Sequence, residues 1–145
     1  MSLPTEASIK AIIGHEFPGG EYLIAHWENF LLTECTGAEA LPDGLAHPVA
    51  LFHVPILGSG TSIAEMFALG QATSEFSIGI ESYEWELIQP LEEEVTYRID
   101  GSIIDASRVE GERVYDRIIY RVEMSRAGEP VARVTVIWHY NREAR

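Results

Sequence analysis

The spacing of hydrophobic and polar residues changes along the chain after Gly70. Before this point apolar residues recur at helical spacing, and after it they alternate with polar residues at the period of two that is typical of half-buried β-strands. Four long strands are therefore predicted in the second part. They cover Phe76 to Ile88, Val95 to Ser107, Val114 to Met124 and Val131 to Tyr140. A tight connection over Ala127 to Glu129 indicates a hairpin between the last two strands.

The alternation also assigns the two faces of the last two strands. The predicted core face carries Ile118, Tyr120, Val122 and Met124, and then Val134, Val136, Trp138 and Tyr140. Polar residues such as Arg121, Arg133 and His139 take the opposite face. A sheet with one apolar face needs a covering layer, which the first part of the chain has to supply.

The first part of the chain predicts a short strand followed by helices. Glu21 to His26 is strand-like, and Trp27 to Glu34 has its apolar residues at helical spacing. Residues Gly37 to Ala46 have the glycine, proline and aspartate content of a loop. Further on, Ser62 and Glu65 match a capping box and predict another short helix.

Between these elements, Val49 to Leu57 is apolar apart from His53. A helix here is predicted to be buried on every side, with Phe52 and Ile56 in the core. Pro55 should kink it, because proline lacks an N–H and its ring clashes with the carbonyl four residues earlier. A strand, a helix, a buried helix and four antiparallel strands follow the order of the hot-dog fold. This is an α+β fold in which a curved antiparallel sheet wraps a central apolar helix.

The composition indicates one globular domain over residues 1–145, with 46% hydrophobic and 23% charged residues. The single Cys35 excludes an internal disulfide, and no metal site is expected without Cys/His pairs at ligand spacing. A cytoplasmic location is expected, since residues 1–15 lack a signal-peptide pattern and no apolar run approaches the ~20 residues of a membrane span. The net charge of −13 repels phosphate backbones, so nucleic acid is not an expected partner.

Several segments of the second part follow one another in an order that resembles the C-terminal part of MaoC-like proteins. They are Glu84 to Leu91, Tyr97-Arg98, Arg108 to Gly111, Asp116, Tyr120 to Glu123, Gly128 to Thr135 and Trp138. More narrowly, the chain is similar to the group related to the N-terminal half of hydratase/dehydratase enzymes, the fatty-acid-synthase-type dehydratase domains. The resemblance implies a dimer whose sheets join edge to edge. It also implies an acyl thioester of coenzyme A or acyl carrier protein at the subunit interface, with no other cofactor.

The catalytic motif of this family is degenerate here. Its dehydratases carry Asp-x-Asn-Pro-x-His before the central helix, because reversible hydration of an enoyl thioester needs an acid–base pair that holds one water molecule. With Pro42 at the motif's proline, Glu39 takes the Asp position, while Leu41 and Gly44 replace the Asn and the His. The resemblance therefore implies fold and ligand class more strongly than activity.

His47 is the first candidate for a substitute catalytic base. It is expected at the N-terminus of the apolar helix, beside backbone N–H groups that could polarise a thioester carbonyl, with Glu39 or Asp43 to orient its ring. The alternative is a capping or loop-packing role, since an imidazole near carboxylates is a common feature of sequences.

Other residues are candidates for substrate binding. His53 is either a hydrogen-bonded core histidine or a group that points into a substrate tunnel, with Gly58 at the end of the same segment. Arg108, Arg113 and Arg117 offer a site for the phosphates of coenzyme A, or are solvated on the outer face of a strand.

Two classes of function remain. One is an enzyme, either a 3-hydroxyacyl-thioester dehydratase or enoyl hydratase, or a thioesterase. Thioesterases of this fold can use a helix carboxylate, a role open to Glu65 besides capping. The other class is a non-catalytic subunit that binds an acyl thioester, as a homodimer or as a heterodimer with a MaoC-like chain that carries the intact motif. The degenerate motif favours the second class.

Overall fold

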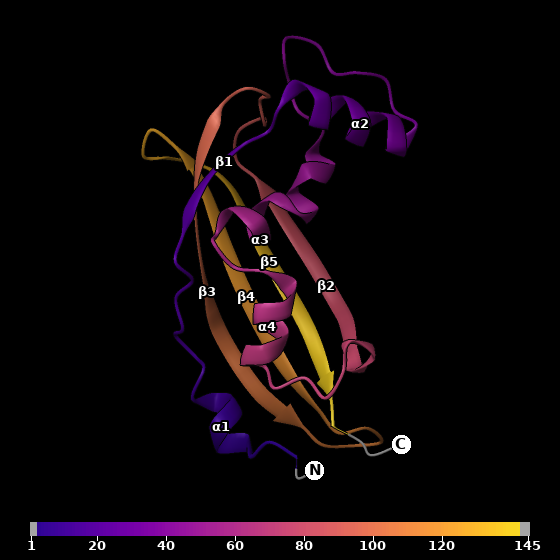
Figure 1. The fold of residues 1–145 in the computed structure, drawn as a ribbon, viewed down its shortest axis with the longest axis vertical. Helices are drawn as coiled ribbons and strands as arrows, with labels where there is room; N and C mark the ends of the chain where they lie inside the picture. The colour runs from indigo at the N-terminus through magenta and orange to yellow at the C-terminus, as the bar shows by residue number, and fades with distance from the viewer. Residues whose placement is uncertain (1–2, 143–145) are drawn as a thin grey trace.

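The computed structural model describes residues 3–142. Their five strands form one antiparallel sheet (Figure 1). The strands lie in the order β1-β3-β4-β5-β2, so β1 and β2 form the two edges. Their bounds are β1 Gly20–Leu23, β2 Ile78–Leu87, β3 Thr96–Val109, β4 Tyr115–Arg126 and β5 Glu129–Asn141. The four long strands predicted from the sequence are confirmed, and their ends lie within one or two residues of those expected.

Short helices precede the long strands. Their bounds are α1 Glu6–Lys10, α2 His26–Thr36, η1 Pro48–Phe52, α3 Val54–Gly58, α4 Ile63–Leu69 and η2 Glu75–Ser77, where η denotes a 3-10 helix. In Figure 1, α3 and α4 lie in front of the central strands, and α2 lies at the opposite end of the molecule from the chain termini. This sheet with helices against one face confirms the predicted α+β hot-dog fold. None of the helices within residues 3–142 is long and apolar enough to cross a membrane.

The core lies between the sheet and the helices. On β4 and β5 the predicted core face is confirmed, because none of its residues is more than 3% exposed. These residues are Ile118, Tyr120, Val122, Met124, Val134, Val136, Trp138 and Tyr140. From the helix side, α3 packs so closely on the sheet that a Cβ on Gly58 would lie 2.3 Å from the Cδ1 atom of Ile99.

The central apolar helix is interrupted, and the break lies at His53, earlier than the predicted kink. A 3-10 turn ends at Phe52 and an α-helix starts at Val54. The cause is Pro55, since a proline in a helix interior offers no N–H to the carbonyl of Leu51 and clashes with it. The chain therefore closes the turn before Pro55 with a tighter bond, from the His53 N–H to the Ala50 carbonyl at 3.3 Å.

The prediction that this apolar segment is buried on every side is wrong. Ile56 is buried as expected, but Phe52 is 51% and Leu57 is 54% exposed. The segment lies on a single sheet, and no second layer among the described residues covers its far side. Phe52 instead leans on Tyr83 of the edge strand β2, with their ring centroids 5.0 Å apart.

The predicted cap of α4 is confirmed in part. The Ser62 hydroxyl accepts a hydrogen bond from the Glu65 N–H at 3.1 Å, as a capping box requires. The Glu65 carboxylate accepts from the Thr61 hydroxyl at 3.1 Å instead of returning to the Ser62 N–H. Glu65 thus holds the turn that leads into the helix.

Candidate functional site

Helix α2 packs with its polar side toward the rest of the chain. Three of its apolar residues, Trp27, Phe30 and Leu31, are 66%, 56% and 53% exposed, and Leu32 packs against the core. A helix on a globular core usually shows the reverse arrangement. The inward side of α2 instead carries Glu28 and Asn29, which make the hydrogen bonds that hold the helix in place.

Glu28 joins three elements in one polar cluster. Its Oε2 atom accepts a hydrogen bond from the Tyr22 hydroxyl of β1 at 2.8 Å and lies 2.8 Å from Nε2 of His53. The side chains of His53 and Glu28 are 29% and 12% exposed, so the pair is shielded but reachable from solvent. The rings of Tyr22 and His53 meet edge to face at 6.3 Å between centroids. The break at His53 thus brings its imidazole to a carboxylate from another helix.

Proton positions in this cluster follow from what each group can donate. Burial, then the hydrogen bond to Glu28 and its negative charge, raise the pKa of Tyr22 to about 12, so the phenol keeps its proton at neutral pH. A carboxylate only accepts, which assigns the imidazole proton of His53 to Nε2. Its Nδ1 atom then carries a lone pair and has no hydrogen-bond partner among residues 3–142. The arrangement is that of a base held in one tautomer by a carboxylate.

A second polar group, centred on Asn29, fixes the loop after α2. The Asn29 amide donates to Glu93 Oε2 at 2.7 Å and accepts from the backbone N–H of His47 at 2.9 Å. Glu93 also lies 2.8 Å from Nδ1 of His26, and this hydrogen bond and charge raise the pKa of His26. The hydrogen bonds from Asn29 and His26 lower the pKa of Glu93 in return. The group ties α2 to the β2–β3 connection.

The three predicted catalytic residues do not meet in this structure. His47 precedes η1, and its Nδ1 atom accepts from the Val49 N–H at 3.0 Å, which is the capping alternative. Glu39 and Asp43 are exposed on the loop, and neither forms a hydrogen bond or ion pair with His47 within residues 3–142. A catalytic role for these residues stays a prediction.

The predicted substrate-binding residues are also dispersed. Gly58 is buried where α3 meets the sheet. Arg108 binds Asp116, whereas Arg117 binds Glu81, and the register places these two arginines on opposite faces of the sheet. Arg113 is exposed on the β3–β4 connection. The arginines therefore form no joint phosphate site within residues 3–142. His53, in contrast, lies in a polar cluster and keeps a ring nitrogen that has no hydrogen-bond partner in this part of the chain.

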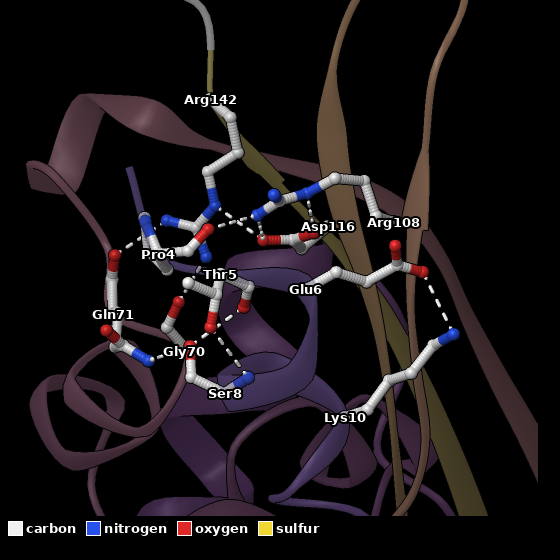
Figure 2. A network of polar contacts seen from close by, with 10 residues as sticks. All are labelled: Pro4, Thr5, Glu6, Ser8, Lys10, Gly70, Gln71, Arg108, Asp116 and Arg142. Carbon is white, nitrogen blue, oxygen red and sulfur yellow. Dashed lines mark hydrogen bonds and ion pairs between the residues drawn. The ribbon is translucent and has the colours of Figure 1, made fainter. Parts of the chain in front are cut away.

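Arg108 belongs to a buried ion cluster near the chain ends (Figure 2). Both oxygens of Asp116 bind Arg108, at 2.9 and 3.0 Å, and Oδ2 also accepts from Arg142 Nε at 2.7 Å. The side chains of Asp116 and Arg142 are 0% exposed. The two guanidinium groups also donate to the carbonyls of Pro4, Gly70 and Gln71. This cluster links both ends of the chain to the end of α4.

An apolar groove runs beside α4. It has a volume of about 510 Å³ and lies between the segment 15–18 and the helix. Phe17, Pro18 and Leu69 line it, and the carboxylate of Glu65 lies at its wall with Thr61. The groove places Glu65 beside a space that an apolar group can fill.

Sequence reasoning missed Tyr22 and Glu28. Glu28 lies between the apolar residues that mark α2 as a helix, so the pattern gave no reason to place it inward. The only available signal was the run of polar residues on the other side of that helix, Glu28, Asn29, Thr33 and Thr36, which make hydrogen bonds in the structure.

No protein-family model matches the sequence, and no curated protein matches it either. Solved structures do match. The ChsH1-ChsH2 complex from Mycobacterium tuberculosis contains a chain with a TM-score of 0.69 at 14% identity, over 96% of this chain and 90% of that one. The truncated HadBC complex, a 3R-hydroxyacyl-ACP dehydratase from the same organism, gives 0.68 at 9% identity, over 88% and 96%.

A third match is a MaoC-like dehydratase from Phytophthora capsici, with a TM-score of 0.65 at 13% identity. The match covers 98% of this chain but only 51% of that one, so the chain spans about half of its length. At such identities the likeness shows the fold. The chain shares its hot-dog fold with these three structures.

Proposed function

We propose that this chain is one subunit of a two-subunit hot-dog protein that binds an acyl thioester of coenzyme A or acyl carrier protein. The reaction type is that of a 3-hydroxyacyl-thioester dehydratase or enoyl hydratase, and full turnover depends on the assembled pair. The observation that carries the proposal is an uncovered apolar surface along the edge strand β2.

On β2, Ile80, Trp85 and Leu87 share the core face of the sheet, since they pair with Trp138, Val134 and Ala132 of β5. They are nevertheless 62%, 41% and 43% exposed. Phe52 is also exposed, and its ring packs on Tyr83 of the same strand, so it extends this apolar surface. An edge strand with an open apolar face is a ready site for another chain.

The comparisons support a pair. Two of the matched structures are complexes of differently named chains, and the third is about twice the length of this chain. A homodimer would cover the β2 surface by symmetry. The degenerate motif favours a heterodimer with a MaoC-like chain that carries the intact Asp-x-Asn-Pro-x-His.

Light scattering at micromolar concentration and moderate salt tests the assembly. We expect about twice the 16.2 kDa of one chain, or a one-to-one complex after co-expression with a motif-bearing chain. Trp85→Glu should give a folded monomer, because it places a charge on the apolar β2 surface that the second chain would bury. The matched control is Glu84→Gln on the opposite face of β2, which should leave the pair intact. A monomer with wild-type Trp85, alone and with such a partner, would contradict the proposal.

Calorimetry with crotonyl-coenzyme A and 3-hydroxybutyryl-coenzyme A tests the ligand class. We expect saturable binding of both, and no binding would contradict it. Hydration of crotonyl-coenzyme A by this chain alone should be slower than by a motif-bearing dehydratase by a factor on the order of 10²–10⁴, the usual contribution of a general acid or base. Turnover equal to that of such an enzyme would remove the dependence on a partner.

A thioesterase is the second candidate, because Glu65 lies at the wall of the apolar groove. Release of free coenzyme A from acyl-coenzyme A substrates, followed with a thiol reagent, separates the two. Release that Glu65→Gln abolishes would favour hydrolysis, while its absence favours the dehydratase type. No cofactor beyond the thioester is part of either proposal. A cytoplasmic location fits the exposed thiol of Cys35, which stays free in a reducing compartment.

A further inference from the structure

We infer that His53 is a catalytic base for the proton at C2 of the bound acyl thioester, with Glu28 and Tyr22 as its positioning residues. The inference rests on the proposed function and names the residue of this chain that does its chemistry. It assigns this role to a histidine outside the degenerate motif.

The first step is the tautomer. Glu28 Oε2 lies 2.8 Å from Nε2 of His53 and holds the proton there, which leaves the lone pair on Nδ1. The Tyr22 hydroxyl donates to the same oxygen at 2.8 Å and fixes its position. When Nδ1 gains a proton, the nearby carboxylate stabilises the resulting imidazolium, as in other carboxylate–histidine pairs. The pair is therefore built to accept and return a proton at one atom.

The second step is access. The His53 side chain is 29% exposed. The side chain of its partner Glu28 is 12% exposed and so is partly withdrawn from water. Phe52 precedes His53 in the chain, Leu57 lies one helical turn after it, and each is about half exposed. A thioester that approaches from solvent can therefore reach the imidazole, and the same segment offers exposed apolar side chains to its acyl chain.

The other histidines lack this combination. Nδ1 of His47 is engaged in the cap of η1, and the ring of His26 is 74% exposed beside Glu93. His139 also lies 2.8 Å from a carboxylate, that of Glu81, but it stands on the outer face of the sheet, away from the helices. His15 is exposed before β1. His53 alone among the described histidines joins a shielded carboxylate to a free ring nitrogen on the helix side.

The reaction balances with this one base. Nδ1 takes the proton from C2 of a 3-hydroxyacyl thioester, and the C–H electrons form the C2–C3 double bond. The C3–O bond breaks, and the departing hydroxide takes the proton from Nδ1 to leave as water. The imidazole returns to its starting form, and hydration of the enoyl thioester is the reverse. No oxidant or other reactant is needed.

The test follows exchange of the C2 protons of butyryl-coenzyme A in deuterium oxide by NMR, with the full chain in its solution assembly. Butyryl-coenzyme A has no hydroxyl to lose, so exchange reports the proton transfer alone. We expect measurable exchange, a loss of at least 100-fold in His53→Asn and of about 10- to 100-fold in Glu28→Gln. The dissociation constant should change less than about threefold, so that the loss lies in rate and not in binding.

Tyr22→Phe should slow exchange several-fold with unchanged binding, and Glu28→Asp should recover part of the rate lost in Glu28→Gln. The matched controls are His26→Asn, the exposed histidine of the other His–Glu pair, and Glu34→Gln on the same helix. Both should exchange at the wild-type rate. Circular dichroism checks that every variant is folded.

Binding without exchange in the wild type, or wild-type exchange in a folded His53→Asn variant, overturns the inference and leaves the proposed function standing. Failure of the wild type to bind any acyl thioester removes both.

Discussion

Two charged clusters lie at opposite ends of the molecule, and they differ in whether any group is left free. Near the chain ends, Asp116 is fully buried and both of its oxygens are taken by Arg108 and Arg142. At the α2 end, Glu28 is partly exposed and holds one nitrogen of His53, while the other nitrogen has no partner among residues 3–142. The engaged oxygens and full burial of Asp116 suit a role in holding the fold together, whereas the partnerless ring nitrogen of His53 can also exchange a proton.

The largest effect is expected from Asp116→Ala. The change leaves two arginines in a buried site without their counter-charge, and loss of one partner from a buried ion pair typically costs about 3–5 kcal/mol. The free energy of unfolding in urea measures it. Asp100→Ala is the control, since Asp100 pairs with Arg98 at a surface position with 62% of its side chain exposed, where about 1 kcal/mol or less is expected. Equal losses in the two variants would show that the buried cluster contributes no more than a surface pair.

His53→Asn should destabilise the chain far less, by about 1–2 kcal/mol, because it removes one hydrogen bond to a charged group at a partly exposed site. The same urea titration measures it. If His53→Asn cost as much as Asp116→Ala, the α2-end cluster would be as structural as the buried one, and the comparison would fail.

The ionisation of Tyr22 gives a further test of the cluster around Glu28. Its pKa is raised to about 12, and removal of the negative charge in Glu28→Gln should lower it. Absorbance at high pH, as the difference between each protein and its Tyr22→Phe counterpart, measures the shift. Because the pKa in the folded chain exceeds its ordinary value of 10.0, the stabilisation is complete below pH 10 and is lost as the pH rises toward 12. An unchanged titration in Glu28→Gln would mean that burial alone sets it.

The smallest effect is expected at Glu81 on the outer face of the sheet. Hydrogen bonds from Arg117 and His139 lower the pKa of Glu81 from 4.5 to about 2. Since this pKa is depressed, the stabilisation is present above pH 4.5 and is lost as the pH falls toward 2. Glu81→Gln should flatten the pH dependence of unfolding in this range, by about 1 kcal/mol or less at a site one-third exposed. A wild-type pH dependence in Glu81→Gln would contradict this assignment.

The strands could be predicted because apolar and polar residues alternate along them, most clearly in β4, where the buried positions recur at a period of two. The helix break at His53 could be predicted only in part. Pro55 indicates that the helix is interrupted, but it does not indicate at which residue the break lies. The exposure of Phe52 depends on the absence of a second layer over the sheet, and no local pattern reports that.

The polar cluster could not be predicted for a different reason. Glu28 and His53 are 25 residues apart, and their contact requires α2 to turn its polar side inward. The apolar residues Trp27, Phe30 and Leu31 make the opposite orientation the natural expectation. In the same way, Asp116 is a polar residue at a buried, core-facing position of β4, and only the fold brings Arg142 to it.

The strand order has a consequence for biosynthesis. β2 is the first of the long strands to be made, yet its only partner in the sheet is β5, the last. While residues 88–128 are synthesised, the apolar side chains of β2 have no sheet to join. Pairing of such distant segments slows folding, and unpaired apolar strands are prone to misassociation. The nascent chain therefore completes its sheet only after Asn141 has been added, so β2 depends on β5, or on another chain, to be shielded before then.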